Sequence, residues 1–108
     1  MACAPRPEPI PEGTDTRWYG NIASGEKFGV TIGDDYASAR EVLVNDGFRS
    51  DGVVPCSKNN GVTFECSAPY EAGMFRLKRF GKDGSVYLIL DDKVVVQIVW
   101  SFGIISLP

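Results

Sequence analysis

The sequence predicts an α+β fold in which one helix packs on an antiparallel sheet of about four strands. Three apolar segments of strand length follow one another between residues 75 and 102, separated by short polar breaks at 81–84 and 91–93. Each break has the length of a hairpin connection, so these segments are expected to form a C-terminal β-meander. A single amphipathic helix is indicated between residues 33 and 48.

Composition and charge limit the classes of function that this chain can have. The chain has 108 residues, 44% of them hydrophobic, which fits one α+β domain over 17–108 behind a Pro-rich tether at 1–16. A net charge of −3 with eleven scattered basic residues argues against a nucleic-acid partner. Histidine is absent, which removes the commonest general base and metal ligand, so we expect no cofactor and no metal.

The N-terminal segment resembles the junction of a bacterial lipoprotein. Four of the seven prolines alternate with other residues before Gly13, which predicts an extended, mobile tether. Ala2-Cys3 is similar to the site where a small residue precedes a lipidated cysteine. On this interpretation Met1 replaces a removed signal peptide, and the protein touches the membrane only through lipid on Cys3. The alternative is an ordinary cytosolic start with a chance cysteine.

Two aromatic residues, Trp18 and Tyr19, open the ordered part of the chain. We expect them to anchor it against the sheet, with a ligand role for Trp18 as the alternative. The alternation in 28–32 predicts a strand. In the helix that follows, Asp34 is the expected N-cap and Gly47 the left-handed residue that ends it. The residues expected to face the sheet are Tyr36, Ala39, Val42 and Leu43.

Cys56 and Cys66 flank a turn signal at 58–61. We expect a disulfide between them, with two buried thiols as the alternative, because the paired short spacings of a thiolate metal site are missing. Such a disulfide implies an oxidising compartment. Pro55 cannot donate to a ladder and marks an edge strand.

The register of the meander follows from its two turns. We expect the first turn to close on Phe80 and Ser85, and the second to take three residues, since a two-residue turn would bury Gln97. The meander side chains then directed to the core are Phe75, Leu77, Val86, Leu88, Leu90, Val94, Val96, Ile98 and Trp100. Across the whole chain, the principal core residues are expected to be Phe28, Val30, Leu43, Phe75, Leu77, Leu88, Val96 and Ile98.

The other face of the meander is too apolar for a solvated surface. Its candidate protein-binding residues are Arg76, Lys78, Tyr87, Ile89, Val95, Gln97 and Val99. Either Trp18-Tyr19 and the tail 104–107 cover this face, or a protein partner does, namely an envelope protein or a second copy. The basic and amide rim favours an acidic partner.

An enzyme is the minor hypothesis. Its best candidate is the carboxylate pair Asp91 and Asp92 beside Lys93, an unconventional hydrolase site. These residues lie in a turn, where aspartate is common for conformational reasons. We therefore expect no catalytic residues.

Segment 32–43, with its glycine, cap and Glu41-Val42 helix, resembles the small SmpA/OmlA lipoproteins. Segments 82–87 and 92–98 are similar to the final strands of that family. That family includes the E subunit of the outer-membrane β-barrel assembly machine. The resemblance implies a non-catalytic periplasmic protein-binding module anchored to the outer membrane, acting in its assembly or integrity. β-Lactamase inhibitory proteins are built from similar units, so a secreted or periplasmic enzyme inhibitor is the alternative.

Overall fold

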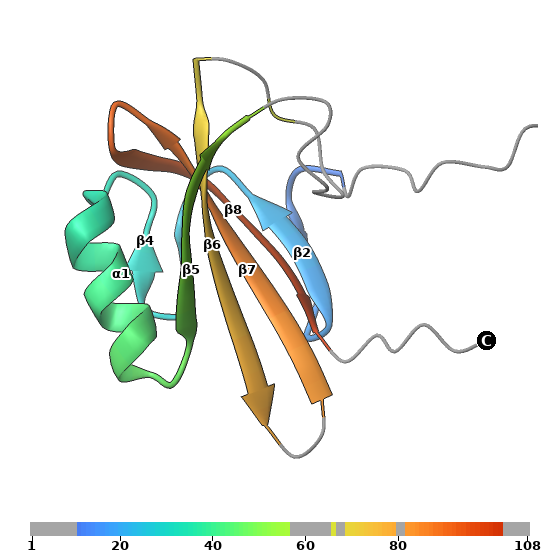
Figure 1. Cartoon of the computed structure of the whole chain (residues 1–108). Helices are drawn as coiled ribbons and strands as arrows, with labels where there is room; N and C mark the ends of the chain where they lie inside the picture. The colour runs from blue at the N-terminus through green and yellow to red at the C-terminus, as the bar shows by residue number, and fades with distance from the viewer. Residues whose placement is uncertain (1–10, 57–65, 67–68, 80–81, 103–108) are drawn as a thin grey trace, which may run out of the picture.

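The computed structural model describes residues 11–56, 66, 69–79 and 82–102, and for 78, 79, 82 and 83 the backbone alone (Figure 1). One helix and eight strands occur in this part of the chain. In order they are β1 (Thr14–Asp15), β2 (Tyr19–Ile22), β3 (Glu26–Lys27), β4 (Val30–Thr31), α1 (Tyr36–Asn45), β5 (Arg49–Pro55), β6 (Glu71–Arg79), β7 (Lys82–Asp91) and β8 (Val94–Phe102).

The fold is α+β, with one helix beside an antiparallel sheet, and the sheet is larger than the sequence predicts. Six strands pair in the order β1-β2-β8-β7-β6-β5, and β3-β4 forms a separate hairpin near α1 (Figure 1). The meander β6-β7-β8 forms the centre of the six-stranded sheet. The estimate of about four strands is wrong because β1 and β2 are too short to show periodicity. β5 was obscured by a glycine and a proline, and it lies at the edge as Pro55 requires.

Helix α1 begins one residue later than expected because Asp35, not Asp34, is its N-cap. The Asp35 carboxylate accepts hydrogen bonds from the Ser38 backbone N–H (3.0 Å) and hydroxyl (2.8 Å). The backbone N–H above all, then the hydroxyl, lowers the pKa of Asp35 below its ordinary value. Asp34 instead accepts from the Thr31 N–H (2.9 Å). The expected role of Gly47 fits its left-handed φ of 102° just after the helix.

The start of α1 is fixed to the β7–β8 turn. The Tyr36 backbone N–H donates to the Lys93 carbonyl, and Asp35 pairs with Val94 in an isolated antiparallel β-bridge. Ala39 and Leu43 are buried, Tyr36 packs partly against the core, and Val42 is 38% exposed. The buried face of α1 is therefore narrower than the apolar pattern of its sequence predicts. The described part of the chain contains no helix with the length and apolar character needed to cross a membrane.

The main core lies between α1, the β3–β4 hairpin and one face of the large sheet. Its buried members are Ile22, Val30, Ala39, Leu43, Phe48, Phe75, Val86, Leu88, Leu90, Val95, Ile98 and Trp100. Five of the expected core residues are among them: Val30, Leu43, Phe75, Leu88 and Ile98. Phe28 and Leu77 pack against this core while partly buried, and Val96 does not belong to it.

The misplacement of Val96 arises at the second turn. Asp91 pairs with Val94, so the turn has two central residues, Asp92 and Lys93, both with positive φ (53° and 67°). That geometry matches the twist of a hairpin. A register shift follows, because Leu90 pairs with Val95 while Ile89 pairs with Gln97. The additional residue in β8 directs Val95 into the core and keeps Gln97 out of it, so the prediction of a three-residue turn is wrong.

The first turn also differs from expectation. Phe75 pairs with Val86 and Arg79 with Lys82, whereas closure on Phe80 and Ser85 would pair Phe75 with Leu90. The register therefore differs by four residues. An even shift keeps every side chain on its expected face, which is why the core assignments of Phe75, Val86 and Leu88 survive. Residues 80 and 81 lie outside the described part.

The N-terminal residues join the sheet instead of lying across it. β1 pairs with β2, and β2 pairs with β8 through Tyr19–Ser101 to Ile22–Ile98. The expected tether boundary at residue 16 is therefore too late, because Thr14–Asp15 is already a strand. The expectation that Trp18-Tyr19 covers the far face is wrong: β2 extends that face, and both side chains are more than 40% exposed. The tail 104–107 lies outside the described residues.

Candidate protein-binding face

The candidate site is the face of the large sheet turned away from α1, which we call the outer face. Side chains alternate along each strand, so the neighbours of core residues Phe75, Val86 and Trp100 point to it. It divides into an apolar part near the β7–β8 turn and an accessible part toward the free end of the β6–β7 hairpin.

The apolar part is a second cluster, which we call the outer cluster. Its buried members are Cys56, Ala72, Ile89 and Val99, with Val54, Cys66, Tyr87 and Val96 partly buried around them. A disulfide joins Cys56 to Cys66 (Cα–Cα 5.3 Å) and places both cysteines against this cluster. Beside it the Gln97 amide donates a hydrogen bond to the Asn21 side chain, which is 6% exposed.

Several predicted interface residues are therefore inaccessible. The prediction that Val95 lies on the outer face is wrong. Because of the register shift in β8, its side chain faces the main core and is fully buried. Ile89 and Val99 are on the outer face as expected, but are 0% and 2% exposed. They stabilise the sheet from its second side and are not available to a partner in this state. Gln97 is half-buried.

The accessible part centres on a strip that crosses five strands. Successive register partners place its members side by side on β5, β6, β7, β8 and β2: Arg49, Arg76, Ser85, Ser101 and Tyr19. We call this the outer strip. Ser85 and Ser101 separate the arginines from Tyr19. Their short side chains project less far from the sheet than the side chains at the two ends of the strip. Tyr19 is 42% exposed.

Beside the outer strip lies a second row of register partners. It contains Met74, Tyr87 and Val99, and Met74 and Tyr87 are half-buried. Arg76, Tyr87 and Gln97 are thus the predicted binding residues that keep an accessible surface on this face. Lys78 occupies a β6 position paired with Asp83, but its side chain is outside the described part. Cys3 also lies outside it.

Charge on the outer strip is concentrated at β5 and β6. The Asp51 carboxylate lies 3.2 Å from Arg76 Nε and 3.6 Å from Arg49 Nε. Two guanidinium groups thus share one carboxylate, which leaves a local positive charge on an acidic chain. Five of the eleven basic residues lie at this end of the sheet: Arg49, Arg76, Lys78, Arg79 and Lys82. Four of these lie within residues 76–82, and the pairing of β5 with β6 adds Arg49 to them.

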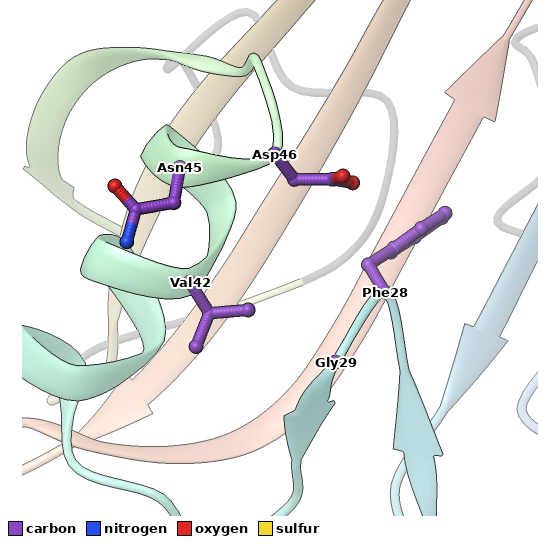
Figure 2. A pocket seen from close by; sticks show the side chains of 5 residues that line it. All are labelled: Phe28, Gly29, Val42, Asn45 and Asp46. Atoms are coloured by element: carbon purple, nitrogen blue, oxygen red, sulfur yellow. The ribbon is translucent and has the colours of Figure 1, made fainter.

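The other candidate chemistry is less organised. Asp91 and Asp92 are exposed at the β7–β8 turn, where the positive φ of Asp92 shows its conformational role. Figure 2 shows a shallow depression between the end of α1 and the β3–β4 hairpin, whose lining includes Phe28, Val42 and a single carboxylate, Asp46. No group of three His, Cys, Asp or Glu side chains that could hold a metal occurs among the described residues.

The alternation along the last strand places Ser101 on this face, whereas sequence reasoning missed Arg49, Met74, Ser85 and Tyr19 as members of it. Met74 and Ser85 could have been found by extending the alternation along their own strands. Arg49 and Tyr19 depend on pairing between distant segments, which no local pattern encodes.

Comparison with known proteins adds no identification: no family model, no curated protein and no solved structure matches the chain.

Proposed function

We propose that this protein is a non-catalytic, protein-binding module of the bacterial envelope, and that a protein partner docks on its outer face. The observation that carries the proposal is the accessible Tyr, Met and Arg of the outer strip and its neighbouring row, on a sheet face opposite the helix. Tyrosine, methionine and arginine are enriched at protein interfaces, and Tyr and Arg often carry much of the binding energy.

A compartment outside the cytoplasm is part of this proposal. The Cys56–Cys66 disulfide supports it, since structural disulfides persist where the environment is oxidising. Lipid on Cys3 would attach the domain to the outer membrane from the periplasmic side, as the resemblance to SmpA/OmlA lipoproteins implies. A stable anchor needs more than one acyl chain, which a diacylated cysteine provides.

The test is site-specific photo-crosslinking in cells that make the protein. A photoreactive amino acid at Ser101, in the middle of the outer strip, is expected to give a discrete crosslinked band. The matched control is the same amino acid at Ala37, a small exposed residue on α1. Equal crosslinking from both positions, or none from Ser101, would contradict docking on the outer face.

A further inference from the structure

The edge strand β5 carries a local irregularity that organises charge. Its pairing with β6 shifts between Ser50 and Gly52, so Asp51 is the additional residue of a bulge. Gly52 has φ of 96°, a conformation that glycine adopts without strain. The bulge brings the Asp51 carboxylate between the side chains of Arg49 and Arg76, which are direct register partners.

This arrangement orients the arginines without neutralising both. The Asp51 side chain is 24% exposed, while those of Arg49 and Arg76 are 84% and 67% exposed. The contacts found with Asp51 use the Nε atom of each arginine. The Nη groups of a guanidinium form the planar fork that binds a carboxylate through two hydrogen bonds. Asp51 thus brings two such forks near each other, with Arg76 in the closer contact, and groups positioned in advance lose less entropy on binding.

The geometry points to a carboxylate-binding site at Arg49 and Arg76 that receives an acidic segment of a protein partner. This inference rests on the proposed function and names the chemistry of its partner. The outer strip runs from these arginines over Ser85 and Ser101 to Tyr19, across four interstrand spacings or roughly 19 Å. An extended peptide covers that distance with about six residues.

The partner segment is therefore acidic at one end and apolar or aromatic about six residues away, where it meets Tyr19. The acidic residues Asp91 and Asp92 lie at the opposite end of the meander and disfavour docking of such a segment there. Because both arginines lie at one end of the outer strip, they set the direction in which the segment lies along it. A protein segment fits better than a lipid surface, because the site continues into serines and a tyrosine instead of further basic residues.

The experiment measures binding of a fluorescein-labelled oligoglutamate peptide to the purified protein by fluorescence anisotropy at low ionic strength, with oligoglutamine of equal length for comparison. Arg49→Gln/Arg76→Gln is expected to weaken oligoglutamate binding by about tenfold or more. Arg40→Gln, at an exposed helical arginine, is expected to leave it unchanged. Arg76→Lys keeps the charge and is expected to weaken binding several-fold, because the fork is lost.

Thermal melts establish whether each variant is folded. We expect all of them to fold, because Arg40, Arg49 and Arg76 are exposed. Unchanged binding by the double Gln variant, equal binding of oligoglutamine, or binding to phosphatidylglycerol vesicles without binding to oligoglutamate would each overturn the inference. Crosslinking at Ser101 separates the two proposals. If it persists while oligoglutamate does not bind, the carboxylate site fails and the module stands. If oligoglutamate binds without crosslinking, the anion site stands and the module fails.

Discussion

Replacing Trp100 with alanine is expected to lower the free energy of unfolding by about 3–5 kcal/mol, enough to leave a chain of this size barely folded. Trp100 is fully buried on β8, and its indole N–H donates to the Thr16 carbonyl at 3.0 Å. The Phe28 ring meets it edge-on at 5.5 Å, and the Lys27 ammonium lies 4.6 Å from its ring centre. Across the sheet, Gly20 leaves the space that the indole occupies. The measurement is chemical denaturation followed by circular dichroism.

Trp18→Ala is the matched control, because it removes the same kind of side chain from a residue that is 44% exposed. Its cost is expected to be about 0.5 kcal/mol or less. Similar losses for the two variants would mean that the Trp100 side chain is not in the core and that β8 is placed wrongly.

Removing the disulfide with Cys56→Ala/Cys66→Ala is expected to cost about 2–4 kcal/mol, because the bond closes a short loop in the unfolded chain. The two cysteines are ten positions apart. They also pack in the outer cluster with Ala72, Ile89 and Val99, so part of the loss comes from exposing that cluster. Denaturation curves of the variant and of reduced wild type should nearly coincide.

Cys3→Ser provides the control, because it removes a sulfur without touching the disulfide and is expected to leave stability unchanged. A wild-type curve that reductant does not move would show that the Cys56–Cys66 bond is absent or does not stabilise the fold. If the bond is absent, the argument for an oxidising compartment loses its support.

The helix and the centre of the core could be predicted because their signals are local. The cap, which was predicted one residue too early, the spacing of Ala39 and Leu43, and Gly47 all lie within one short segment. In the meander, alternation assigned Phe75, Val86 and Leu88 correctly even though the register was wrong by four residues, because an even shift does not exchange the faces.

What failed depends on contacts between distant residues. The β8 irregularity that exchanges the faces of Val95 and Val96 lies next to a two-residue turn with two left-handed residues, and Asp92-Lys93 is not the usual sequence for such a turn. The predicted binding face included Ile89 and Val99, but apolar residues on a second face are buried here beside a disulfide. Alternation gives the face of a residue and does not show what covers it.

The charged site was beyond sequence reasoning for the same reason. Arg49 and Asp51 are close in sequence, yet only the β5–β6 pairing brings Arg76 to them. Tyr19 joins the outer strip through β2, a strand of four residues that shows no clear periodicity.

Hydroxyl-radical footprinting, on the purified protein and in intact cells, tests the docking of a partner on the outer face most directly. Tyr19 and Met74 report on the outer face, and Val44, 39% exposed on α1, reports on the opposite side. We expect Tyr19 and Met74 to be modified in the purified protein and protected in cells, with Val44 modified to the same extent in both settings. Equal modification of Tyr19 and Met74 in both settings would show that nothing docks on the outer face.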